Sequence, residues 1–174
     1  MHVPHWAFHD DDIPRGFAPF NIQGIGPNLY VTYAKQDGTQ HDDVPGAGLG
    51  FVNVFGTRGQ LLARLQHGPW LNAPWGVVQA PAYFGEFSHS VLIGNFGAGT
   101  IAAFNAVTGQ FLGNVLNPDG STLAIDGLWG LGFGNGGASG PGNTLFFTAG
   151  PNDESNGVFG TLVPIAAEND NDEP

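Results

Sequence analysis

The sequence predicts an all-β protein built from β-propeller blades, and three observations lead to that fold class. Glycine and proline number 29 and 13 among 174 residues, too many for long helices, whereas abundant Val, Ile, Phe and Trp favour short strands joined by tight turns. An aromatic-centred stretch recurs, with Phe20, Trp75 and Trp129 spaced 55 and 54 residues apart. Strand-like segments also recur between these aromatics, which is typical of a repeated supersecondary unit.

Residues 1–17 form a lead-in to the first unit, rich in His, Asp and Pro. One short strand is expected around residues 3–8, and the rest is expected to be irregular. Histidines at positions 2, 5 and 9 are of a type that binds Zn, Ni or Cu. The alternative is that these histidines are exposed side chains of a loose segment.

The first unit is assigned to residues 18–73 and is predicted to contain four antiparallel strands. Each strand is a short apolar or alternating run bounded by turn residues, and residues 57–59 carry a hairpin signal between the last two. The predicted strands are 20–23, 29–33, 50–55 and 60–65.

The second and third units repeat this plan, at residues 74–126 and 127–165. The second has predicted strands at 75–78, 91–96, 100–104 and 110–115. The third has strands at 128–133, 144–148 and 158–162 and lacks a fourth. Residues 166–174 are expected to be a disordered acidic tail.

Three blades are too few to close a propeller, which takes about four to eight. One completion is a homodimer in which two chains form a six-bladed ring, each lead-in supplying the outer strand that the partner's third blade lacks. Such a swap would remove open sheet edges, which otherwise invite aggregation. The alternative is a three-sheet monomer or fragment with exposed edges.

Composition excludes several classes of function. The net charge is −11 and only four residues are Lys or Arg, so a nucleic acid or an anionic membrane is not an expected partner. No apolar run reaches membrane-spanning length, and the first residues lack the basic and apolar regions of an export signal. The chain has no Cys, which excludes disulfides and thiolate metal sites.

Several segments resemble a family of secreted bacterial β-propeller proteins of unassigned function, distantly similar to NHL-repeat propellers and often ending in a PEP-CTERM sorting signal. The resemblance covers residues 8–165, and this chain matches the C-terminal half of such proteins, without their export signal or sorting tail. It implies a propeller fold and an extracellular or periplasmic location, and it supplies no catalytic residues. The matching segments are 19–23, 30–37, 41–44, 72–76, 125–131 and 148–154.

In a propeller blade, the loops between second and third strands share one face with the connections between blades. Ten of the fifteen acidic residues are expected on that face, including Asp10, Asp11 and Asp12 of the lead-in and Asp119. Carboxylates beside amide and backbone oxygens suit Ca²⁺, although the spacing does not match an EF-hand. The alternative is that these side chains are solvated or cap turns. The candidate Ca²⁺ ligands are Asp37, Asp42, Asp43, Asn152, Asp153 and Glu154.

Catalytic and ligand-binding candidates are fewer. Asp126 and Asn21 could hold a metal that activates water at the channel mouth, and His41 could act as a general base beside Asp42. Trp75, Trp129 and Gln23 could line the same mouth and bind a ligand, although tryptophans at these positions also suit packing between blades.

Two functions are therefore consistent with the sequence. The first is a non-catalytic binding or interaction module whose acidic face binds a ligand such as a glycan or an extracellular partner, with Ca²⁺ as the only expected cofactor. The second is a Ca²⁺-dependent hydrolase of lactones or esters with its site at the channel mouth.

Overall fold

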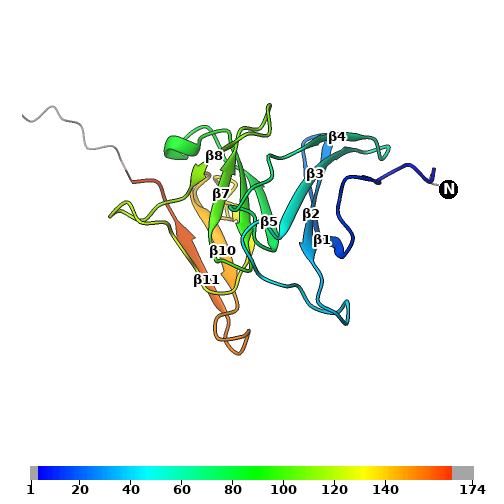
Figure 1. Ribbon diagram of the computed structural model, residues 1–174. Coiled ribbons are helices and arrows are strands. Elements are labelled where there is room, and N and C mark those ends of the chain that lie inside the picture. The colour runs from blue at the N-terminus through cyan, green and yellow to red at the C-terminus, as the bar shows by residue number, and fades with distance from the viewer. Residues whose placement is uncertain (1–3, 166–174) are drawn as a thin grey trace, which may run out of the picture.

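The computed structural model describes residues 4–165, and in this range the protein is all-β with one short 3₁₀-helix, η1 (Gly85–Phe87). Eleven strands form three separate antiparallel sheets, which we call blades 1, 2 and 3 (Figure 1). Blade 1 contains β1 (Phe17–Ile25), β2 (Asn28–Lys35), β3 (Gly50–Gly56) and β4 (Leu61–Arg64). Blade 2 contains β5 (Pro74–Gln79), β6 (Val91–Asn95), β7 (Ile101–Phe104) and β8 (Phe111–Asn114), and blade 3 contains β9 (Leu128–Phe133), β10 (Leu145–Ala149) and β11 (Val158–Leu162).

The predicted fold class is confirmed, with sheets of four, four and three strands, and the strand order within each sheet follows the sequence. Strand pairing is antiparallel throughout, because each strand is joined to the next by a turn or loop that reverses the chain. The expected strand at 3–8 is wrong for its described residues: the backbone turns here, with the N–H of Ala7 donating to the carbonyl of Pro4 at 3.0 Å. The predicted tail, residues 166–174, lies outside the described residues.

Blade 2 is buried on both of its faces, so its central strands are apolar at successive positions. Side chains alternate between faces of a strand, and on β6 Ile93 joins the core shared with blade 1 whereas Leu92 joins the core shared with blade 3. All residues of β6 and β7 are buried. This explains why these strands read as continuous apolar runs.

The recurring aromatics occupy the same structural position in each blade. The innermost strands β1, β5 and β9 each have a break in register, and the aromatic lies within it: Phe20 between Pro19 and Asn21, Trp75 between Pro74 and Gly76, and Trp129 between Leu128 and Leu131. A β-bulge of this kind re-aims a side chain. The side chains meet as a result, with Trp75 edge-on to Phe20 at 4.8 Å and to Trp129 at 4.7 Å.

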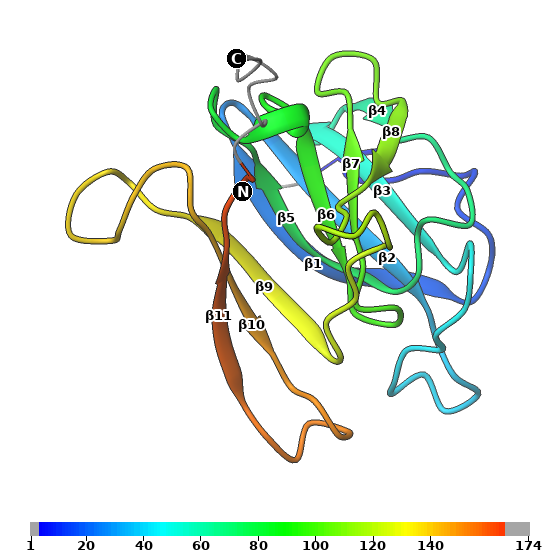
Figure 2. The same cartoon turned by 90° about the vertical axis from the view of Figure 1, so that its left-hand side faces the viewer.

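The three blades form an open arc and do not close into a ring (Figures 1 and 2). The outer face of blade 1 is covered by the lead-in, where Phe17 and Ile13 pack on a cluster that includes Phe51 and Phe55. Phe8 lies 5.7 Å from Phe55, measured between ring centroids. The lead-in therefore contacts its own blade 1 in this structure.

No helix among residues 4–165 has both the length and the apolar character needed to cross a bilayer.

Candidate functional site

Loops from all three blades lie together on one side of the arc, where the strands end, and we call this side the acidic end. It consists of the β2–β3 loop (36–49), the last residues of the β8–β9 connection (125–127) and the β10–β11 loop (150–157). The β2–β3 and β10–β11 loops project at the same end of the molecule in both views (Figures 1 and 2). A hydrogen bond also joins two of these segments, because the backbone N–H of Asn152 donates to the side-chain Oδ2 of Asp126 at 3.0 Å.

Asp37 closes the β2–β3 loop through its carboxylate. Its carboxylate accepts hydrogen bonds from the hydroxyl of Thr39 at 2.6 Å and from the backbone N–H groups of Thr39 and His41 at 3.1 and 3.0 Å. These bonds hold the pKa of Asp37 below its ordinary value, and the bond from the Thr39 hydroxyl has the largest effect. The turn-capping alternative therefore accounts for this residue.

Asp43 is different, because its charge is not compensated. Its Oδ2 atom is buried without a hydrogen-bond partner among the described residues. Burial raises the pKa of Asp43 above its ordinary value, and the charges of Asp42 and Glu154 add to that rise against a backbone hydrogen bond that lowers it. Glu154 belongs to blade 3 and Asp43 to blade 1, so the repulsion between carboxylates acts across the arc.

A small hollow of about 120 Å³ lies beside Asp43. Phe20 contributes an aromatic wall, and the polar lining comes from the end of β2 and the loop that follows it. The lining residues are Ala18, Pro19, Phe20, Ala34, Lys35, Gln36, His41, Asp42 and Asp43.

The predicted Ca²⁺ ligands of blade 3 form an unusual turn. Asn152, Asp153 and Glu154 have φ values of 56°, 50° and 61°, a left-handed conformation that non-glycine residues seldom adopt in succession. The N–H of Glu154 donates to the carbonyl of Gly150 at 3.1 Å. Within residues 4–165, no three His, Cys, Asp or Glu side chains meet as a metal-binding group. The predicted ligands therefore come to one end of the molecule without forming a coordination sphere.

The candidate catalytic residues have structural partners. Asn21 donates from Nδ2 to the carbonyl of Trp75 at 2.8 Å and accepts at Oδ1 from the N–H of Ile22 at 2.7 Å, which ties blade 1 to blade 2. Asp126 holds the β10–β11 loop. His41 Nδ1 lies 3.2 Å from Asp42 Oδ1, and both side chains are largely exposed.

Of the predicted ligand-binding residues, two meet and one does not. Trp75 and Trp129 are half-buried and in contact with each other and with Phe20. Phe96, from the turn after β6, stacks on Trp129 with ring centroids 4.3 Å apart. Gln23 is exposed farther along β1, where its Nε2 donates to the carbonyl of Gly24 at 3.2 Å.

Placing Asp10 on the acidic face is wrong. Only 4% of its side chain is exposed, and it is ion-paired with Arg64 on the outer face of blade 1. Its Oδ2 also accepts a hydrogen bond from Asn53 Nδ2 at 2.8 Å. Burial alone would raise the pKa of Asp10, but hydrogen bonds from Arg64, the backbone of Asp12 and Asn53, together with the Arg64 charge, outweigh it and leave the pKa below its ordinary value.

Asp119 and Asp11 each contact a residue two positions away in the sequence. Asp119 accepts from the hydroxyl and N–H of Ser121 at 2.6 and 2.9 Å, which lowers the pKa of Asp119. His9 Nε2 lies 2.8 Å from Asp11 Oδ1. His2 lies outside the described residues.

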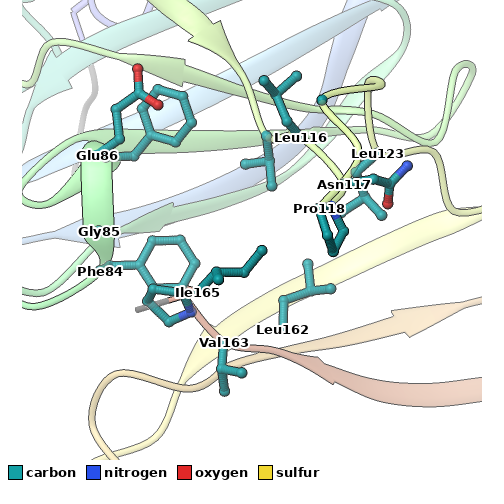
Figure 3. Close-up of a pocket in the computed structure, with 14 residues that line it drawn as sticks. Phe84, Gly85, Glu86, Leu116, Asn117, Pro118, Leu123, Leu162, Val163 and Ile165 are labelled. Carbon is teal, nitrogen blue, oxygen red and sulfur yellow. The ribbon is translucent and has the colours of Figure 1, made fainter. Parts of the chain in front are cut away.

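An apolar groove of about 390 Å³ was not predicted from the sequence (Figure 3). It lies where the segment around η1, the start of the β8–β9 connection and the residues after β11 meet. Phe84, Leu123 and Leu162 belong to the core between blades 2 and 3, whereas Ile165 is 67% exposed at the rim. Its lining comes from three segments that are far apart in sequence, so no local pattern indicates it.

No family model matches the chain. It is similar to three uncharacterized proteins of Acanthamoeba polyphaga mimivirus: R640 (36% identity over 134 residues), R648 (35% over 158) and L690 (36% over 160). The matches cover 74%, 87% and 88% of this chain, and 25%, 37% and 40% of the viral proteins. The chain thus spans between a quarter and two fifths of the length of these relatives.

Two solved structures are similar to parts of this fold. A protein of unknown function from Bacteroides caccae matches with a TM-score of 0.46 and 14% identity, over 79% of this chain and 40% of that one. Kuenenia stuttgartiensis hydrazine synthase matches with a TM-score of 0.45 and 11% identity, over 83% of this chain and 46% of that one. Neither similarity is close enough to support an inference about function.

Proposed function

We propose that the chain is a non-catalytic binding module of β-propeller type whose acidic end binds a cation, with Ca²⁺ as the best candidate. The observation that carries the proposal is Asp43, whose buried Oδ2 has no partner among the described residues. Asp42 and Glu154 add negative charge beside it. A hard cation would supply the missing partner and reduce the repulsion among the three carboxylates.

The size of the hollow favours an ion over a glycan. Ligand pockets for organic molecules span roughly 300–1,000 Å³, whereas the hollow beside Asp43 measures about 120 Å³. A water molecule occupies about 30 Å³ in the liquid, so the hollow has room for a cation that keeps part of its water shell. Because the protein ligands do not surround one point, we expect weak binding that is completed by water.

The partners of the catalytic candidates support a non-catalytic role. Asn21 uses both ends of its amide, Nδ2 on the carbonyl of Trp75 in blade 2 and Oδ1 on the N–H of Ile22, and Asp126 accepts at Oδ2 from the backbone of the β10–β11 loop. The Asn21 amide is thereby occupied at both ends, and Asp126 uses one carboxylate oxygen to hold the loop. Hydrolysis of lactones or esters stays a prediction from the sequence, as do the extracellular location, the bacterial family resemblance and a glycan ligand.

Thermal unfolding with and without Ca²⁺ tests the proposal. A ligand at one hundred times its Kd stabilises the folded state by about 2.7 kcal/mol, which corresponds to a rise in Tm of roughly 5–10 °C for a chain of this size. We expect a rise with CaCl₂ that EDTA reverses and that a KCl solution of equal ionic strength does not produce.

Matched variants locate the site. Asp43→Asn and Glu154→Gln should each reduce the Ca²⁺-dependent rise, because each removes one negative charge from the acidic end. Glu86→Gln removes the same charge at η1, between β5 and β6, and serves as the control. Equal Ca²⁺ responses in all three variants would place the ion elsewhere. No response in the unmodified chain would refute the proposal.

A further inference from the structure

The two ends of the arc differ in how their outer faces are covered. On blade 1 the lead-in lies over the sheet, and Asp10 fixes it there through Arg64 and Asn53. On blade 3 the outer face carries Phe146 and Phe159, whose rings stack at 5.7 Å between centroids. Phe159 is 71% exposed, so this face is uncovered within the part of the chain that the structure describes.

The outer face of blade 3 is also hollowed. A cavity of about 530 Å³ lies between the β9–β10 loop and the strands, and most of its walls are apolar side chains and glycines. Its lining residues are Gly132, Phe133, Ala138, Ser139, Gly140, Phe146 and Phe159. An aromatic side chain buries 150–250 Å² when it is covered. An aromatic side chain from outside would therefore be stabilised by entering an apolar hollow of this kind.

The lead-in supplies such a side chain at the opposite end of the arc. Trp6 is 51% exposed, and its neighbours are held in place because the N–H of Phe8 donates to the carbonyl of Gly59 at 2.8 Å. Trp6 is therefore a large apolar group on an anchored backbone. The lead-in and β11 lie on opposite sides of the molecule (Figure 1).

Topology places Trp6 and the hollow near the same end of the strands, the end opposite the acidic end. In an up-and-down blade, the turn between strands one and two and the turn between strands three and four lie at the same end. Gly59 belongs to the β3–β4 turn of blade 1, and Ala138 and Ser139 belong to the β9–β10 loop of blade 3. That loop projects away from the β10–β11 loop (Figure 2). A two-fold axis that passes through the centre of the arc, parallel to the axis around which the blades are arranged, would keep Trp6 of one copy and the hollow of the other at the same height.

We propose that two copies of this chain associate head to tail, with Trp6 of each copy inserted into the hollow on blade 3 of the other. The contact joins two different surfaces, and we place the two copies on a two-fold axis, so that it closes after two copies instead of continuing as a filament. It covers both exposed aromatics and the open outer face of blade 3. This arrangement needs no exchanged strand, since residues 4–8 form a turn and stay on their own blade 1.

Light scattering after size-exclusion chromatography tests the association. The unmodified chain should elute as a dimer, and Phe159→Asp or Trp6→Ala should weaken dimerisation by roughly a thousandfold, about thirtyfold for each of the two identical aromatic contacts that the substitution removes. Tyr83→Asp is the matched control, because Tyr83 is 83% exposed and lies outside both surfaces. A chain that stays monomeric at every concentration tested, or a dimer that Phe159→Asp leaves unchanged, would overturn the proposal.

Cysteine cross-linking tests the head-to-tail arrangement directly, since the chain has no Cys of its own. His5→Cys and Ser139→Cys both place a thiol on an exposed position, one beside Trp6 and one at the hollow. Under mild oxidation the double variant should form covalent dimers, and each single variant alone should not. Dimers from Ser139→Cys alone would indicate contact between two copies of blade 3 and would overturn the proposal. Far-UV circular dichroism checks that every variant is folded.

Discussion

Gly127 and Gly150 lie in direct backbone contact where blade 3 begins. The N–H of Gly150 donates to the carbonyl of Gly127 at 2.8 Å, and a Cβ atom on Gly127 would collide with the carbonyl of Gly150. Gly127 also has φ of +64°, a region that side chains disfavour. The contact holds the start of β9 against the base of the β10–β11 loop, which carries Glu154.

Replacing Gly127 with Ala should therefore destabilise the protein by roughly 3 kcal/mol or more, because it adds a backbone clash to the cost of a left-handed alanine. Gly136→Ala is the matched control. Gly136 has φ of +78° with open space around its Cβ position, so we expect only the conformational cost of about 1–2 kcal/mol. Urea unfolding followed by fluorescence measures both. Equal losses in the two variants would refute the close contact.

Asp10→Asn tests the attachment of the lead-in to blade 1. Removing one partner of a buried ion pair costs about 3–5 kcal/mol, and we expect about 2–3 kcal/mol here because Arg64 is 27% exposed and can be hydrated. Asp11→Asn should have almost no effect, since the Asp11 side chain is 92% exposed. Urea unfolding at neutral pH compares the two variants, and a similar stability for both would contradict the pairing.

The pH dependence of the same pair has a definite sign. The pKa of Asp10 lies below its ordinary value of 3.8 in the folded state, so its contribution to stability is present above pH 3.8 and is lost as the pH falls through the folded value. The stability difference between the unmodified chain and Asp10→Asn should shrink below that pH. A difference that stays constant through the acid range would show that Asp10 does not act through its charge.

Asp43 should show the opposite dependence. Its pKa is raised above 3.8, so the folded state binds its proton more tightly than the unfolded state, and stability falls as the pH rises between 3.8 and the folded value. Without added cation, Asp43→Asn should therefore be more stable than the unmodified chain at neutral pH, by about 1 kcal/mol at most because solvent screens this partly exposed group. Thermal unfolding at pH 7 in EDTA measures it. A clear loss of stability would contradict the unpaired carboxylate.

The sequence predicts the strands well because their signals are local. Alternation, apolar runs and turn residues place all eleven strands, since each depends on neighbours within a few positions. The spacing of Phe20, Trp75 and Trp129 is informative for a different reason: a repeated unit places an aromatic residue in the corresponding bulge each time. The acidic end is partly predictable, because loops of a blade alternate between two ends.

The lead-in is not predictable in the same way, because its position depends on partners 43 and 54 residues away. Asn53 carries the one available signal. It is the only polar residue within the run from Phe51 to Phe55, and it is fully buried. A buried amide needs a hydrogen-bond partner, so its presence indicates that a polar group from another segment covers blade 1. Nothing in the sequence near Asp10 identifies that group.

The aromatic cluster at the centre of the arc gives a test of the repeat itself. Trp129 is in edge-on contact with Trp75 at 4.7 Å and stacks on Phe96 at 4.3 Å. Trp129→Ala should cost about 3 kcal/mol, at the low end for tryptophan because the ring is half-buried. Tyr83→Ala, at an 83% exposed position, should stay within about 0.5 kcal/mol of the unmodified chain.

A double-mutant cycle separates contact from general destabilisation. If Trp75 and Trp129 touch, their alanine substitutions should be non-additive by about 0.5–1.5 kcal/mol, the range measured for aromatic pairs. The two residues are 54 positions apart in the chain and lie on strands of different sheets. Coupling between them therefore requires that blades 2 and 3 share a common centre. Strict additivity would mean that the inner strands do not converge, and the acidic end would then lose the geometry that brings Asp43 near Glu154.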